Sequence, residues 1–264
     1  MNTHREEGIR QAVRETYANI AKGVANGCGC GPSSCCGASA ESATHAERVG
    51  YSRHQAQAVP QGAEMGLGCG NPQAIAALKP GETVLDLGSG GGFDCLLAAR
   101  AVGGEGQVIG VDMTPEMIDR ARANTDEAGV TNVEFRLGEI EHLPVADATV
   151  DVIIANCAIN LATDKPAVYR EAYRVLKTGG RLAIADMVAR APLPESIRDD
   201  VVLYAGCIGG AASLEEIKTL LSEIGFIDVE IQVRFEVGGT PVSEAMDRFI
   251  ADNIASSTIK ATKP

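Results

Sequence analysis

From about residue 73 onward, the apolar positions of the chain follow two alternating patterns. Short runs of Val, Ile and Leu, typical of buried strands, are followed by segments in which apolar residues recur at the spacing of one helical face. The pattern predicts strands at residues 83–87, 107–111, 133–137, 150–155, 181–187, 227–235 and 257–261. It predicts helices at residues 93–101, 115–128, 166–176, 194–203, 213–224 and 243–250. Strands and helices that alternate with short connections predict an α/β fold, with a mostly parallel sheet covered by helices on both faces.

The N-terminal part of the chain has a different pattern. Apolar residues recur at helical spacing in an otherwise polar first segment, at Ile9, Val13, Tyr17 and Ile20. This spacing predicts an amphipathic helix within residues 1–24. Residues 25–62 are rich in Gly, Ser and Ala and show no apolar period, so we expect a mobile loop there. We therefore divide the chain into an N-terminal helix with a cysteine-rich segment, residues 1–72, and an α/β domain, residues 73–264.

Composition and charge exclude several classes of partner. With 45% hydrophobic and 22% charged residues, the chain has the balance of a soluble globular protein. The net charge of −12 repels phosphate backbones and anionic lipid, and an aromatic content of 4% offers few stacking platforms for nucleobases. No apolar run approaches the roughly 20 residues of a membrane span, and the polar N-terminus shows no export signal. We expect a cytoplasmic protein that binds neither nucleic acid nor membrane.

A glycine-rich turn follows the first strand of the predicted domain. The strand ends in Asp86-Leu87-Gly88-Ser89-Gly90-Gly91-Gly92, and a helix begins directly afterwards. Glycines let the backbone approach a ligand closely, and the helix N-terminus presents unpaired N–H groups. Asp112 closes the next strand, where a carboxylate can accept hydrogen bonds from both hydroxyls of a ribose. A dinucleotide site usually has the spacing Gly-x-Gly-x-x-Gly, and the Asp86 carboxylate would repel a pyrophosphate. The same carboxylate suits the ammonium group of S-adenosylmethionine, so the spacing favours this cofactor.

These motifs resemble those of the class I S-adenosylmethionine-dependent methyltransferases. The resemblance covers about residues 73–235 and is carried by Val84-Leu85-Asp86-Leu87-Gly88-Ser89-Gly90, Gly110-Val111-Asp112, Leu143-Pro144, Asp151-Val152-Ile153 and Leu176-Lys177-Thr178-Gly179-Gly180-Arg181-Leu182. It implies a Rossmann-like fold with a central, mostly parallel, seven-stranded sheet. It also implies a set of cofactor-binding residues around the methionine, ribose and adenine moieties: Asp86, Gly88, Ser89, Gly90, Asp112, Met113, Gly138, Glu139, Ile140 and Asn156. Residues 177–180 would instead form a tight turn before the fifth strand.

Eight cysteines are the main anomaly of the composition. A structural disulfide framework is not expected in a reducing compartment, so the count points to metal, metalloid or redox chemistry. Three cysteines lie in separate motifs, Gly66-Leu67-Gly68-Cys69-Gly70-Asn71-Pro72, Asn156-Cys157-Ala158-Ile159-Asn160-Leu161 and Tyr204-Ala205-Gly206-Cys207-Ile208-Gly209-Gly210. Cys157 follows the fourth strand, at the edge of the sheet where ligands of open α/β folds bind. This topology alone places Cys157 beside the methyl donor.

The three cysteine motifs, in this order, resemble those of the arsenite methyltransferases, and this resemblance covers nearly the whole chain. It implies that Cys69, Cys157 and Cys207 are the catalytic thiolates and that they bind trivalent arsenic, which is the substrate. The N-terminal segment, residues 1–72, would then form part of the arsenic site. Soft thiolates suit a thiophilic centre such as arsenic, whereas hard cations prefer oxygen ligands. Three thiolates would also leave the arsenic lone pair pointing at the sulfonium methyl group.

No individual role in the arsenic site is assigned to the other five cysteines. Cys95 lies in an apolar helix and is expected to pack in the core. Cys28, Cys30, Cys35 and Cys36 form one Cys-x-Cys-x4-Cys-Cys cluster, not the two separate Cys-x2–4-Cys pairs of common zinc modules. They could form a thiol relay that collects arsenic or resolves disulfides, or they could belong to a loop without a specific role.

The resemblance predicts an enzyme that methylates arsenite, delivered as a thiol conjugate, and so detoxifies arsenic as methylarsenicals. Attack through the arsenic lone pair requires no general base. It produces pentavalent arsenic, so either protein cysteines or an external thiol reductant such as glutathione or thioredoxin must restore the trivalent state. Two alternatives stay open, a methyltransferase for a small organic acceptor and a non-catalytic metalloid-binding protein. A nicotinamide oxidoreductase is disfavoured by the glycine spacing.

Overall fold

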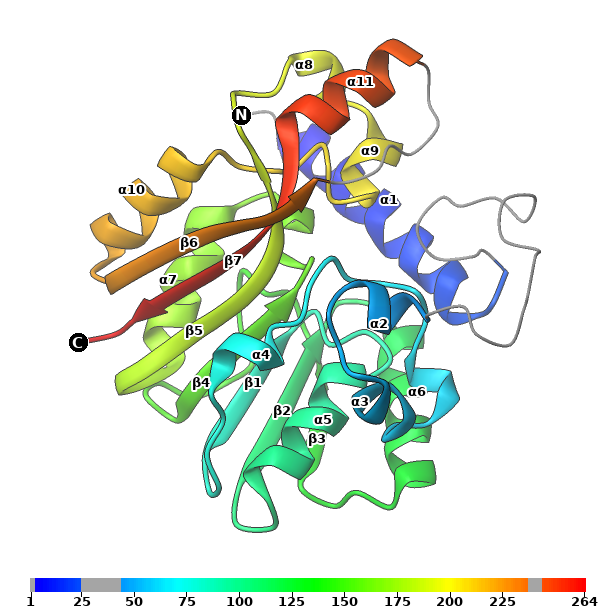
Figure 1. The fold of residues 1–264 in the computed structure, drawn as a ribbon, viewed down its shortest axis with the longest axis vertical. Coiled ribbons are helices and arrows are strands. Elements are labelled where there is room, and N and C mark those ends of the chain that lie inside the picture. Colours follow the sequence, from blue (N-terminus) through cyan, green and yellow to red (C-terminus); the bar gives the residue numbers. More distant parts are fainter. Residues whose placement is uncertain (1–2, 25–43, 237–243) are drawn as a thin grey trace.

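A computed structural model describes residues 3–24, 44–236 and 244–264 of the chain. Its centre is a seven-stranded sheet with the strand order β3-β2-β1-β4-β5-β7-β6 (Figure 1). The strands are β1 (Thr83–Leu87), β2 (Gln107–Asp112), β3 (Val133–Leu137), β4 (Val150–Asn156), β5 (Leu176–Ala189), β6 (Ile227–Glu236) and β7 (Ile254–Thr262). β1 to β5 pair in parallel, and β7 runs antiparallel to both of its neighbours. The predicted α/β fold with a mostly parallel seven-stranded sheet is therefore confirmed.

Helices cover both faces of this sheet. The described helices are α1 (Thr3–Ala21), α2 (His45–Arg48), α3 (Arg53–Gln57), α4 (Gln73–Ala76), α5 (Phe93–Val102), α6 (Pro115–Ala128), α7 (Lys165–Val175), α8 (Glu195–Arg198), α9 (Val201–Ala205), α10 (Leu214–Ile224) and α11 (Glu244–Asn253), with short 3-10 turns η1 (Gln61–Ala63) and η2 (Ile159–Leu161). Buried residues of α4, α5 and α6 pack on one face, and those of α7 and α10 pack on the other. None of the described helices is long and apolar enough to cross a membrane.

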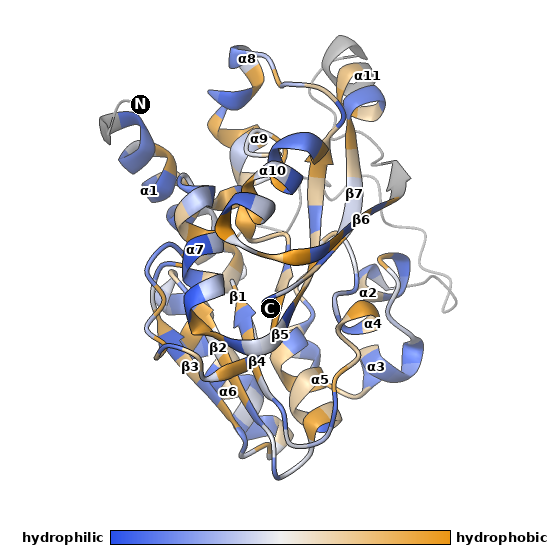
Figure 2. Ribbon diagram, turned by 90° about the vertical axis from the view of Figure 1, so that its left-hand side faces the viewer, coloured by the Kyte–Doolittle hydropathy of each residue, from blue (hydrophilic) through white to orange (hydrophobic). Residues whose placement is uncertain are grey.

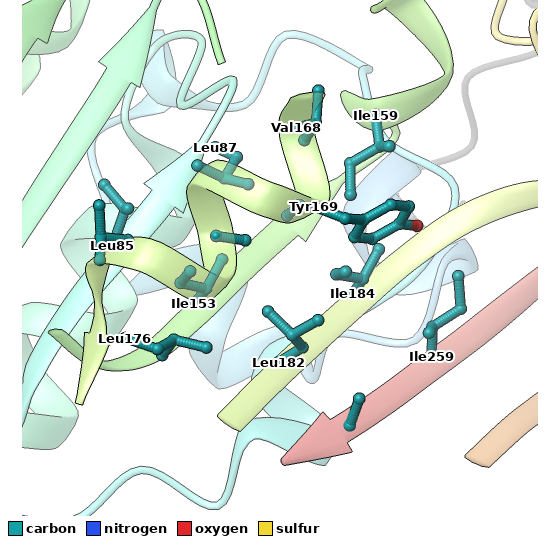
Figure 3. Packing of buried hydrophobic residues seen from close by; sticks show 14 of the residues in the cluster. Leu85, Leu87, Ile153, Ile159, Val168, Tyr169, Leu176, Leu182, Ile184 and Ile259 are labelled. Carbon is teal, nitrogen blue, oxygen red and sulfur yellow. The ribbon is translucent and has the colours of Figure 1, made fainter. Parts of the chain in front are cut away.

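Side chains of β1 alternate between the two faces of the sheet. Val84 packs with α4, α5 and α6, whereas Leu85 and Leu87 pack in the cluster that includes Tyr169 of α7 (Figure 3). Figure 2 shows mostly hydrophilic residues on α1 and α7, so only the inner faces of these helices join the core. Because both faces of β1, β2 and β4 are buried, their sequences read as nearly continuous apolar runs. Because β1 pairs in parallel with both β2 and β4, the carboxyl ends of these three strands meet at one edge of the sheet.

Most predicted elements of the domain are confirmed to within three residues at each end, and two differ more. The helix expected at residues 194–203 is two short helices, α8 and α9, because the Asp200 carboxylate accepts hydrogen bonds from backbone N–H groups in the first turn of α9 and so starts a new helix. β5 begins at Leu176 rather than at residue 181, so the expected turn at residues 177–180 lies within this strand. Gly179 keeps the left-handed conformation of a turn, with φ of 77°.

The N-terminal part contains the predicted first helix, and α1 buries Ile9, Val13 and Ile20 as its spacing indicates. The prediction of a loop over residues 25–62 is wrong for residues 44–62, where α2, α3 and η1 form. Residues 25–43, with Cys28, Cys30, Cys35 and Cys36, lie outside the described part of the chain.

The two short helices after residue 44 are held by local caps and by tertiary packing. Capping boxes start α2 at Thr44 and α3 at Ser52. Between them, buried Tyr51 packs in a cluster with Leu96 and Leu97 of α5. Helices this short gain most of their stability from such contacts, so they leave no apolar period in the sequence.

Candidate active site

A cavity lies at the carboxyl ends of β1, β2 and β4. Ten of the residues selected from the sequence line it: Asp86, Gly88, Ser89, Gly90, Asp112, Met113, Gly138, Ile140, Asn156 and Cys157. Cys69, Glu139 and Cys207, which were also selected, do not line it. Arg10 and Tyr17 of α1 reach the same cavity, together with residues of the segment that includes α2 and η1. The N-terminal part therefore forms one wall of the site.

The glycine turn after β1 forms the floor of the cavity. The N–H groups of Gly88 and Ser89 donate to the carbonyl of Val111 at 2.8 and 3.0 Å, so the turn is tied to β2. Gly88 has φ of 70°, and a Cβ at this position would lie 2.5 Å from the Cβ of Ala158. Only glycine fits there. The Ser89 hydroxyl is buried and has no hydrogen-bond partner among the described residues, so it is available to a ligand in the cavity.

Three buried aspartates, Asp86, Asp94 and Asp112, face this cavity. Burial raises the pKa of each carboxyl group, and the nearby charge of Asp94 raises the pKa of Asp86 further. Buried carboxylates are costly unless a cation or hydrogen-bond donors compensate them. The arrangement therefore suits a ligand with positive charge, and S-adenosylmethionine carries both an ammonium and a sulfonium group.

Asp112 is held at the end of β2 by two backbone donors. One carboxylate oxygen accepts from the N–H of Gly90 at 3.0 Å and the other from the N–H of Thr114 at 2.9 Å. An ionised carboxylate can accept about four hydrogen bonds, so both oxygens retain capacity for the hydroxyls of a ribose.

The acidic side chains after β3 have different positions from those expected. The carboxylate of Glu139 turns away from the cavity toward α1, where it lies 3.1 Å from the guanidinium of Arg14 and 3.7 Å from that of Arg10. Glu141, which was not selected from the sequence, is buried and lines the cavity. Its carboxylate accepts from the N–H of Thr163 at 3.3 Å. Gly138 and Ile140 line the cavity as expected.

A hydrogen-bond network around Asp94 was missed by the sequence analysis. The hydroxyl of Tyr51 lies 2.8 Å from each Asp94 oxygen, and the amide of Gln73 donates to Asp94 at 3.2 Å. The side-chain amide of Asn156 donates to the Tyr51 hydroxyl at 3.0 Å and accepts from the N–H of Cys69 at 3.0 Å. The position of Asp94 in the first turn of α5, just after the glycine turn, is the one sequence signal that could have revealed this network.

The three selected cysteines lie in one region beside the cavity. Cys69 and Cys157 form a disulfide, and the Cys207 thiol donates to the carbonyl of Cys157 at 3.0 Å. All three contact an apolar cluster that includes Met187 and Leu203. Cys157 also lines the cavity, so it connects the cysteine region to the cavity.

Cys95 lies apart from these cysteines, in the core between α5 and the sheet. Its thiol donates to the Asp86 carboxylate at 3.2 Å. Core packing was expected for Cys95, but this contact with a carboxylate of the cavity was not.

Comparisons with known proteins agree with this geometry. Residues 78–225 match the family model described as a methyltransferase domain. The chain is 49% identical to the arsenite methyltransferase of Halobacterium salinarum, over 98% of this chain and 67% of that protein. It is 42% identical to the human arsenite methyltransferase over 54% of this chain and 40% of the human protein.

A solved structure extends the similarity to the fold. An arsenic(III) S-adenosylmethionine methyltransferase from Chlamydomonas reinhardtii matches with a TM-score of 0.65 and 31% identity, over 84% of this chain and 74% of that chain. The chain therefore belongs to the arsenite methyltransferase family of S-adenosylmethionine-dependent methyltransferases.

Proposed function

We propose that this protein transfers the methyl group of S-adenosylmethionine to trivalent arsenic held by Cys69, Cys157 and Cys207, as a route to arsenic detoxification. The observation that carries the proposal is the position of Cys157. It lines the cavity, its sulfur is bonded to that of Cys69, and its carbonyl accepts a hydrogen bond from the Cys207 thiol. The relatives that bear the name arsenite methyltransferase support the same substrate.

The residues of the cavity would hold the methyl donor along its length. Asp86 and the glycine turn, Gly88 to Gly90, would bind the methionine moiety, and Asp112 with Met113 would bind the ribose. Gly138 and Ile140 would flank the adenine, and Asn156 would face the methyl group. Glu141 is better placed than Glu139 to accept from the adenine amino group, because Glu141 is buried and lines the cavity whereas Glu139 does not line it. When bound, S-adenosylmethionine supplies an electrophilic methyl group on sulfur.

Arsenic capture requires the thiol forms of the three cysteines, so the Cys69–Cys157 disulfide must first be reduced. Arsenic bound to an external thiol such as glutathione would then exchange onto the protein. In each exchange an As–S bond to a cysteine forms, an As–S bond to the external thiol breaks, and the cysteine proton leaves with the released thiol. The three cysteines contact an apolar cluster, and their soft thiolates suit a thiophilic centre better than oxygen ligands would.

The chain's own contribution to methyl transfer is mainly orientation and desolvation. The arsenic lone pair attacks the methyl carbon, and no proton is lost in this step. The attack oxidises arsenic to the pentavalent state by two electrons. Oxidation of Cys69 and Cys157 to their disulfide can return these two electrons, and an external thiol such as glutathione or thioredoxin would then reduce the disulfide.

Substitution of single thiols tests the proposal. Reduced Cys157→Ser and Cys207→Ser variants, given arsenite, S-adenosylmethionine and a thiol, should form methylarsenicals about 100-fold more slowly than the unsubstituted protein, because the arsenic loses its fixed position. Cys95→Ser is the matched cysteine control. It should weaken cofactor binding through Asp86 and leave arsenite binding unchanged.

Two outcomes would contradict the proposal. Full activity of both variants would show that these thiols do not hold the substrate. Tight arsenite binding without any binding of S-adenosylmethionine would indicate a protein that only sequesters arsenic.

A further inference from the structure

A buried polar pair lies between two of the cysteines. Asp186, toward the carboxyl end of β5, and Asn160, in η2, are 2% and 3% exposed. The Asn160 side-chain amide donates to the Asp186 carboxylate at 2.9 Å and to the carbonyl of Met187 at 2.6 Å. The proposed methyl transfer gives neither residue a role.

On one side, the pair holds the turn that follows Cys157. The N–H groups of Ile159 and Asn160 donate to one oxygen of Asp186 at 3.1 and 3.2 Å. Cys157 itself has φ of 55°, a left-handed conformation that is unfavourable for any residue except glycine. Such a conformation persists only where the surrounding contacts determine it. The Asp186 carboxylate supplies those contacts directly after Cys157.

On the other side, the pair reaches the loop that carries Cys207. Cys207 is also left-handed, with φ of 62°, and its carbonyl lies 3.5 Å from the Asn160 amide nitrogen. A Cβ at Gly210 would lie 1.9 Å from the backbone oxygen of Asn160, so the loop packs against Asn160 without space for a side chain. Asn160 thus contacts the segments of both cysteines.

Asp186 is also close to the sulfur atoms, yet its oxygens are occupied. A carboxylate oxygen of Asp186 and the sulfurs of Cys69 and Cys157 all lie within 4.8 Å of one another. One Asp186 oxygen accepts from the N–H groups of Ile159 and Asn160, and the other accepts from the Asn160 amide and from the N–H of Met187 at 2.8 Å. These donors fill about the full accepting capacity of a carboxylate. The contacts fit a residue that orients its neighbours better than one that binds arsenic.

We propose that Asp186 and Asn160 are positioning residues, which fix Cys157 and Cys207 at the separation that lets both thiols bind one arsenic atom. This inference rests on the proposed function and adds residues that act through the cysteines. Groups that orient ligands from behind typically contribute about 10–100-fold to affinity or activity.

The test uses Asn160→Ala with Asn132→Ala as its matched control. The Asn132 amide also donates to three carbonyl groups, those of Ala99, Gly103 and Gly106, but it lies near the opposite ends of the strands. X-ray absorption at the arsenic edge counts the sulfur neighbours of arsenite bound to the reduced full-length protein. Isothermal titration gives the affinities for arsenite and for S-adenosylmethionine.

We expect three sulfur neighbours in the unsubstituted protein and in Asn132→Ala, and two in Asn160→Ala. Arsenite affinity and kcat should fall by about tenfold or more in Asn160→Ala. The KM for S-adenosylmethionine should stay within about twofold, because the carboxylates of the cavity are untouched.

Three sulfur neighbours and full arsenite affinity in Asn160→Ala would overturn the inference. If Asn160→Ala no longer binds S-adenosylmethionine, Asn160→Ser takes its place, since serine keeps a short polar group next to the backbone. Loss of cofactor binding in both variants would also overturn it, because the pair would then be a requirement of the fold. Failure of the unsubstituted protein to methylate arsenite would instead contradict the proposed function itself.

Discussion

The two halves of the site differ in how the chain builds them. The donor side consists of the glycine turn after β1 with Asp86 and Asp94 on either side of it, and Asp112 at the end of β2. Hydrogen bonds from the N–H groups of the glycine turn to Val111 and Asp112 tie it to the neighbouring strand. The acceptor side, which consists of Cys69, Cys157 and Cys207, comes from three segments that are far apart in the sequence. One half is therefore a local motif and the other is a product of tertiary structure.

The two sides also differ in chemistry. The donor side gathers buried carboxylates that suit a cation, whereas the acceptor side gathers sulfur atoms within an apolar cluster. This difference suits a reaction between a sulfonium and a soft centre. The contrast predicts that each side can be perturbed separately, except where a side chain belongs to both.

The larger of two further predicted effects is the pH dependence of cofactor binding on the donor side. Since burial raises the pKa values of Asp86, Asp94 and Asp112, protons compete there with a cationic cofactor. Affinity for S-adenosylmethionine should fall as pH is lowered from about 7.5 to about 5, by up to about tenfold per pH unit for each proton displaced. Arsenite affinity should not follow the same curve. Isothermal titration at constant ionic strength measures both.

Lower pH has the opposite effect on the stability of the protein without cofactor. A carboxyl group whose pKa is raised in the folded state holds its proton more tightly than in the unfolded chain, so protonation of these groups favours folding. Cofactor affinity should therefore be lost without unfolding over this range. Asp86→Asn is the control and should bind more weakly at pH 7.5 with a flatter pH dependence. An affinity that is constant over the whole range would contradict the assignment of the donor side.

The smaller effect concerns Tyr51, which joins the two sides. Its hydroxyl contacts Asp94 of the donor side and accepts from Asn156, which in turn accepts from the N–H of Cys69. Tyr51→Phe leaves the buried Asp94 carboxylate without this donor, so the free energy of unfolding should fall by about 1–3 kcal/mol. Affinities for cofactor and arsenite should both fall by a few-fold. Chemical denaturation and titration measure these effects.

Tyr173→Phe is the matched control for Tyr51→Phe. Tyr173 packs edge-on against Phe226, away from the cavity, and phenylalanine preserves this contact. Its substitution should change stability by no more than about 0.5 kcal/mol. Tyr51→Phe could change the stability as little as Tyr173→Phe, or it could weaken the binding of one ligand alone. Either result would show that the two sides are not coupled through this hydroxyl.

The same contrast explains how much of the molecule could be predicted. The bounds of β1, α6 and β3 follow from apolar runs and end signals that lie within each segment. The cavity positions of Asp86 and Asp112 follow from the glycine turn and from the rule that parallel strands end at one edge.

Other features depend on contacts that the sequence does not display. Tyr51 lies in a segment without an apolar period, and its role arises only when α5 packs beside it. The direction of Glu139 depends on the arginines of α1, which approach from more than a hundred residues away in the chain. The proximity of Asp186 to the cysteine sulfurs likewise requires β4 and β5 to pair in their observed register.

A crystal structure of the reduced protein with arsenite and S-adenosylhomocysteine would test the central claim most directly. Anomalous scattering locates the arsenic atom independently of the protein model. We predict one arsenic atom bound to the sulfurs of Cys69, Cys157 and Cys207, at the end of the cavity where Cys157 lines it. Arsenic bound elsewhere in the chain, with these three sulfurs unoccupied, would contradict the account.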